Sequence, residues 1–100
     1  MKIIQKLSDK IEEEIHDAKH YAKWAIEVKE EYPNLAQTLY NIANQEMEHM
    51  RLLHESVVQV INDYRAKNGD PPANMMAVYD YLHGKHIDDA ADAKRLLSMF

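Results

Sequence analysis

Apolar residues recur along the first part of the chain at alternating steps of three and four, which is the spacing of one face of a helix. The carboxylate of Glu14 is the one charged interruption of this first stripe. The stripe comprises Ile4, Leu7, Ile11, Glu14, Ala18, Tyr21, Ala25, Val28 and Tyr32. It predicts a helix that begins at about Ile3, or later if Ser8 is the N-cap, and ends at about Lys29.

A second stripe of the same period predicts a helix from Pro33 to about Lys67. It comprises Leu35, Leu39, Ile42, Ala43, Glu46, His49, Met50, Leu53, Val57, Val60 and Tyr64. Pro33 favours the first position of a helix and disfavours helical geometry in the residue before it, so residues 30–33 form the predicted turn. Gly69 favours a helix stop after Asn68. Residues 1–68 are therefore predicted to form an antiparallel helical hairpin.

Residues 69–100 are predicted to be a linker and a short helical tail. Two short helices are expected, from about Met75 to Leu82 and from about Asp88 to Met99, with Gly84 as the interruption. His83 and His86 straddle this glycine and receive no assignment.

Composition supports an all-α fold and narrows the chemistry. The chain has 100 residues, 46% of them apolar and 29% charged, with only two glycines and three prolines, which favours a few long helices. The absence of cysteine excludes thiolate metal centres. The net charge is −5 and no basic cluster is present, so no nucleic-acid partner is expected. No apolar run approaches the ~20 residues of a membrane span, and we expect a cytoplasmic protein with no membrane partner.

The strongest chemical signal is the Glu-x-x-His motif of Glu46 and His49. The two side chains are about one turn apart on an otherwise aliphatic face. A charge on a buried stripe is costly unless it is paired or binds a metal. Glu48 lies about 200° from Glu46 around the helix and is expected to face solvent.

Glu14 is predicted to be level with this motif. In an antiparallel hairpin, two residues are level when they lie equally far from the turn. The midpoint of Glu14 and Glu46 is residue 30, and that of Glu14 and His49 falls between residues 31 and 32. The three side chains should therefore be level to within about one helical turn.

These three residues make half of a two-metal carboxylate site. Four-helix bundles with such sites take a Glu from two helices and a Glu-x-x-His from the other two. A homodimer of the hairpin supplies that set, so we predict a four-helix bundle completed by dimerisation. Oxygen-rich ligands with one imidazole per metal suit iron, two per dimer site, or manganese; zinc is a further candidate.

The residues that carry these signals also resemble a known family. The segment Ile42–His49 resembles the Glu-x-x-His helix of the ferritin-like superfamily, particularly of rubrerythrins. Glu14, with Tyr21 seven residues later, is similar to the first helix of rubrerythrins and of the short encapsulated ferritins. The resemblance covers roughly residues 10–65. It implies a di-iron centre with ferroxidase or peroxide-scavenging activity, or iron storage in a larger assembly.

Other polar residues near the stripes have two interpretations each. Tyr21 either orients a ligand carboxylate or only packs, and Asp17 is either an outer carboxylate of the site or a solvated residue. His16 and His20 have the spacing of a two-histidine metal clamp but are expected on a solvated face. His54 is expected at the boundary of the core.

Two further functions remain open from the sequence. The hairpin can be a non-catalytic dimerisation and interaction module whose polar stripe residues satisfy one another. It can also hold a single structural metal such as zinc, which binds but is redox-silent.

Overall fold

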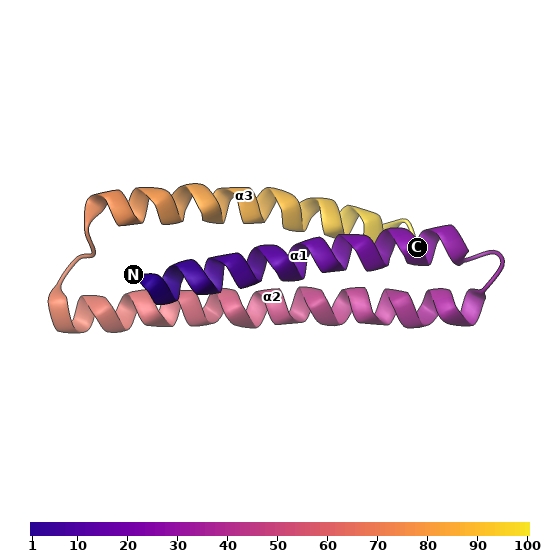
Figure 1. Cartoon of the computed structure of the whole chain (residues 1–100), viewed down its shortest axis with the longest axis horizontal. Helices are drawn as coiled ribbons and strands as arrows, with labels where there is room; N and C mark the ends of the chain where they lie inside the picture. The colour runs from indigo at the N-terminus through magenta and orange to yellow at the C-terminus, as the bar shows by residue number, and fades with distance from the viewer.

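The computed structural model describes residues 1–100 and contains three helices and no strand. They are α1 (Lys2–Val28), α2 (Pro33–Asn68) and α3 (Ala73–Ser98). The helices run side by side along a body of 56 × 18 × 18 Å (Figure 1). The predicted all-α class is confirmed, and α1 and α2 form the predicted antiparallel hairpin. None of the helices carries an apolar stretch that would let it cross a membrane.

The ends of the hairpin helices follow from local residue chemistry. The earlier of the two predicted starts of α1 is correct, since Ser8 is buried inside the helix. Tyr32 leaves helical geometry, with φ −132° and ψ 71°, and Pro33 then opens α2. At the other end, Gly69 has φ +78° and its N–H donates to the carbonyl of Arg65.

The hairpin is held together by two kinds of apolar contact. Toward the N-terminus of α1, branched side chains of α1 pack against Val57 and Ile61 of α2. Nearer the turn the contact consists of small residues, which allow two helices to approach closely. These are Ala18, Ala22 and Ala25 of α1 with Ala36 and Ala43 of α2, each at most 1% exposed.

The prediction of two short C-terminal helices is wrong, because α3 is one helix of 26 residues that passes through Gly84. A glycine inside a helix costs about 1 kcal/mol relative to alanine, and packing on both sides of it outweighs that cost. Tyr79 packs against the core before Gly84, and Ala90 and Leu96 are buried after it. Ile87 of the same helix is 55% exposed.

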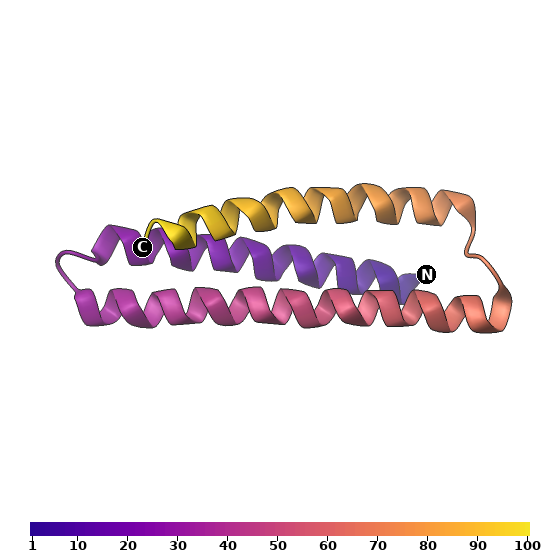
Figure 2. The same ribbon diagram turned by 180° about the vertical axis from the view of Figure 1, so that it is seen from behind.

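α3 packs chiefly on α1, which lies between α2 and α3 in both views (Figures 1 and 2). Ion pairs on this side join Lys85 to Glu12 at 3.1 Å and Lys19 to Asp89 at 3.5 Å. Exposed pairs of this kind contribute little, so the burial of Ala90, Ala93 and Leu96 carries the contact.

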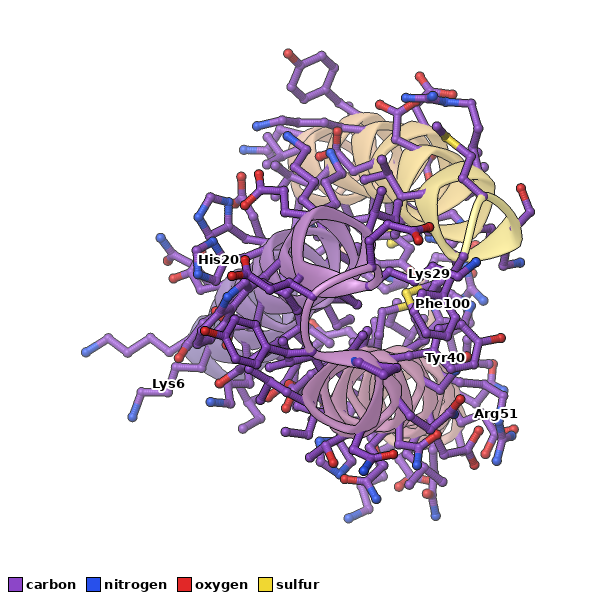
Figure 3. The ribbon with its side chains drawn as sticks, turned by 90° about the vertical axis from the view of Figure 1, so that its right-hand side faces the viewer. Lys6, His20, Lys29, Tyr40, Arg51 and Phe100 are labelled. Atoms are coloured by element: carbon purple, nitrogen blue, oxygen red, sulfur yellow. The ribbon has the colours of Figure 1, made fainter.

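Phe100 holds the C-terminal end of α3 against the end of the hairpin that contains the turn. The ring of Phe100 stacks on Tyr40 of α2 with centroids 4.5 Å apart, and Lys29 lies 5.0 Å above the same ring. Lys29 also donates a hydrogen bond to the carbonyl of Phe100. Figure 3 shows these three residues together beside the hairpin turn.

Two glycine substitutions test whether α3 is continuous. A Cβ at Gly84 meets nothing within 4 Å, so Gly84→Ala should raise the free energy of unfolding by about 1 kcal/mol. Gly69→Ala is the matched control and should lower it by about 1 kcal/mol, because alanine is strained at φ +78°. Urea unfolding followed by circular dichroism measures both. A destabilising Gly84→Ala would mean that the helix breaks there.

The buried imidazole of His86 on α3 should make stability depend on pH. Burial lowers the pKa of His86 below its ordinary value of 6.5, against the opposing effect of Glu12 and Asp89. The unfolded chain therefore binds the proton at higher pH than the folded one. The contribution of neutral His86 to the free energy of unfolding is therefore complete above about pH 6.5. It is lost as the pH falls toward the pKa that His86 has in the folded chain.

Urea unfolding between pH 7.5 and pH 5 measures this effect. His86→Gln should flatten the loss of stability with falling pH, whereas His16→Gln, at an exposed position on α1, should leave the slope unchanged. Equal slopes in the wild type and in both variants would contradict the assignment.

Candidate metal centre

The hairpin brings together the three residues that the sequence singled out. Glu14 comes from α1, while Glu46 and His49 come from successive turns of α2. One ligand atom from each lies within 4.8 Å of the others. His49 Nδ1 is 3.5 Å from Glu14 Oε2 and 3.9 Å from Glu46 Oε2. The predicted register is therefore confirmed, and this group can hold a metal ion.

The three side chains of the group differ in how far they are exposed to solvent. The side chain of Glu14 is 9% exposed, that of Glu46 19% and that of His49 55%. The group thus extends from a buried carboxylate to an imidazole that is exposed to solvent.

One oxygen of Glu14 has no hydrogen-bond partner. Its Oε2 atom is buried and accepts no hydrogen bond, although His49 Nδ1 is 3.5 Å away. A buried polar atom left in this state costs about 1–3 kcal/mol. A cation between Glu14, Glu46 and His49 would remove that cost. Two carboxylates and one imidazole are donors that suit iron, manganese or zinc.

The group opens on the face of the hairpin that α3 leaves uncovered. Glu12 of α1 pairs with Lys85 of α3, and Glu14 lies about 200° from Glu12 around α1. Figure 3, viewed along the helices, has Lys6 and His20 on one side and Tyr40, Arg51 and Phe100 on the other. α3 therefore covers the side of α1 that carries Glu12 and not the side that carries Glu14.

Sequence reasoning missed Lys10, which contacts Glu14. Its ammonium group is 3.4 Å from Glu14 Oε1 and 3.4 Å from the exposed Glu13. Glu13, and then Glu14, raise the pKa of Lys10. The signal was present, since Lys10 and Glu14 have the i, i+4 spacing of a helical pair. Lys10 supplies Glu14 with a cation while no metal is bound.

The neighbouring residues take different places. Tyr21 is half-buried and its ring stacks on Trp24 at 6.5 Å, with no hydrogen bond to Glu14. Asp17 is partly exposed and forms no ion pair. Roles for both at the site stay predictions. His16 and His20 are exposed, as expected.

Glu48 faces solvent, as predicted from its place on the helix. It pairs with Arg51 at 2.5 Å, and this hydrogen bond lowers the pKa of Glu48. Although Glu48 is next to the motif in sequence, its carboxylate is already paired on the outer surface. It therefore serves as a control position for Glu46.

Replacement of Glu14 should stabilise the metal-free protein. Glu14→Met removes a buried carboxylate and keeps most of the volume, so the free energy of unfolding in EDTA should rise by about 1 kcal/mol. Glu13→Met, at an exposed neighbour, should stay within about 0.5 kcal/mol of the wild type. Urea unfolding at one protein concentration measures both. A loss of stability in Glu14→Met would mean that Lys10 and His49 already satisfy this carboxylate.

Comparison of the chain with protein-family models, with characterised proteins and with solved structures gave no match. The proposal for function therefore depends on the geometry of Glu14, Glu46 and His49.

Proposed function

We propose that two copies of this hairpin form a two-metal carboxylate site that oxidises ferrous iron. The observation that carries the proposal is the buried, unpartnered Oε2 of Glu14, with Glu46 and His49 within 4.8 Å. An apolar stripe has no packing reason to place a carboxylate at that point. A bound divalent cation would give that carboxylate a partner and would explain why it lies on an apolar face.

A second copy is needed because one hairpin offers only three ligand side chains. Two copies provide one Glu and one Glu-x-x-His each, which is the ligand set of bundles with two-metal carboxylate sites. Large apolar side chains are exposed on the same face. Ile3 is 47% exposed and Leu35 41% exposed, and each lies about 20° from the glutamate of its own helix, Glu14 or Glu46. A partner hairpin on this face would remove them from water.

Iron is the substrate of the proposed reaction. Two Fe(II) ions each give up one electron, and dioxygen takes both electrons with two protons to leave as hydrogen peroxide. The chain contributes the electrostatics: the carboxylates of Glu14 and Glu46 favour the more highly charged ferric product. The imidazole of His49 adds a nitrogen donor, and Lys10 moves away from Glu14 as the ion enters.

An interaction module is the second candidate, and one observation favours it. The ammonium group of Lys10 and the imidazole of His49 already lie within 3.5 Å of the Glu14 carboxylate. If these contacts suffice, the hairpin dimerises without metal and the polar residues set its register.

Anaerobic titration with Fe(II) followed by exposure to air tests the proposal. We expect one iron per chain, with oxidation recorded as the absorbance of an oxo-bridged ferric product and as oxygen consumption. Sedimentation of the loaded protein should give a dimer or a larger assembly. Glu46→Gln should abolish stoichiometric binding and fast oxidation, whereas Glu48→Gln should retain both because that carboxylate pairs with Arg51.

Two results would contradict the proposal. Absence of saturable binding by a folded chain would leave the interaction module. Saturable binding of zinc or iron without oxygen consumption would indicate a structural metal site.

A further inference from the structure

A recess lies where α3 meets the hairpin, and none of Glu14, Glu46 and His49 belongs to its wall. Its volume is ≈ 300 Å³ and all three helices contribute to its wall. Ile11 comes from α1, Met50 and His54 from α2, and His86 and Ala90 from α3. A recess of this size accommodates a small organic molecule.

The wall of this recess contains the second unpartnered buried polar atom of the chain. His86 is only 6% exposed, and its Nε2 atom is buried and forms no hydrogen bond. Burial lowers the pKa of His86, so the ring is neutral and carries a proton on one nitrogen. With that proton on Nε2, the ring is a donor without an acceptor. A ligand that brings an acceptor into the recess would satisfy it.

The charges around the recess select the kind of acceptor. Although the chain has a net charge of −5, no carboxylate belongs to the wall, whereas Arg51 and Lys94 do. Arg51 is paired with Glu48 and Glu55, but Lys94 forms no ion pair and is available to a ligand. Glu12 and Asp89 lie near His86 and oppose the fall of its pKa, so Lys94 is the group of the wall that favours an anion.

Two stacked histidines form one side of the recess. The rings of His54 and His83 are 4.6 Å apart and nearly parallel, with an interplanar angle of 8°. Burial and then the proximity of His83 lower the pKa of His54, which favours the neutral form of the His54 ring. The flat faces of these two rings can pack against an apolar group of a ligand.

The remaining wall is apolar. Ile11, Met50 and Ala90 contribute to it, and Ile87, which is 55% exposed, stands at its edge. A bound apolar group would cover part of Ile87.

We infer that this recess binds a small amphipathic anion, a monocarboxylate with an unbranched hydrocarbon chain. The carboxylate accepts a hydrogen bond from His86 Nε2 and pairs with Lys94, and the hydrocarbon chain lies against Ile11, Met50 and Ile87. The site is separate from Glu14, Glu46 and His49 and does not require metal.

Calorimetric titration of the metal-free full-length chain with octanoate tests this inference. Octanoate should bind saturably with one molecule per chain. 1-Octanol, which keeps the hydrocarbon chain without the charge, and inorganic phosphate, which keeps charge without the chain, should each bind at least about tenfold more weakly. Glu46→Gln should leave octanoate binding unchanged.

Substitutions test whether octanoate binds at this recess. Lys94→Gln and His86→Gln should each weaken octanoate binding by about tenfold, while Lys67→Gln, an exposed lysine at the end of α2, should not. If His86→Gln fails to fold, nuclear magnetic resonance of the wild type serves instead, and octanoate should shift the ring signals of His86, His54 and His83 but not that of His20.

Several results would overturn the inference. Equal affinity for 1-octanol would remove the role of charge, and equal affinity for phosphate would remove the role of the apolar wall. Binding unaffected by both substitutions would place the ligand elsewhere. Stoichiometric zinc binding that survives Glu46→Gln and is lost in His86→Gln would show that the three histidines hold a cation.

Discussion

The register in which α1 and α2 pair is the constraint on which the other features depend. Pro33 ends the turn at a fixed residue, and completely buried alanines on both helices leave no room for a shifted alignment. Insertion of one residue within α2, between Ala36 and Ala43, would rotate the later side chains of α2 by about 100° relative to the start of the helix. Glu46 and His49 would then leave the level and the face of Glu14. The fold and the candidate site therefore have the same origin.

The third helix divides the hairpin into two faces with different chemistry. α3 covers one side of α1, where Ala90, Ala93 and Leu96 are buried and lysine–carboxylate pairs lie at the edge. The other side remains open and carries the carboxylate group among exposed apolar residues. A single chain thus buries one face and leaves the second with unpaired apolar surface, which is the energetic reason to propose a partner there.

The two buried polar atoms that lack a partner belong to separate groups of residues. Glu14 Oε2 lies in the carboxylate group, and His86 belongs to the wall of the histidine-lined recess. Unsatisfied buried atoms reduce stability, which is the reason to propose a ligand for each. The first atom is grouped with a second carboxylate and an imidazole, whereas the wall of the recess contains Lys94 and no carboxylate.

Sequence alone determined the hairpin and the grouping of its polar stripe residues, because both depend on spacing along the chain. The three-and-four spacing, Pro33 and Gly69 fixed α1 and α2 to within a few residues, and counting from the turn brought Glu14 level with Glu46 and His49. The tertiary structure decided the rest. Gly84 destabilises a helix by about 1 kcal/mol, which is about what a few packing contacts contribute. Whether the helix continues through Gly84 therefore depends on the contact of α3 with α1. The same contact buries His86 and brings His83 onto His54, and no spacing along the chain reports a contact between separate helices.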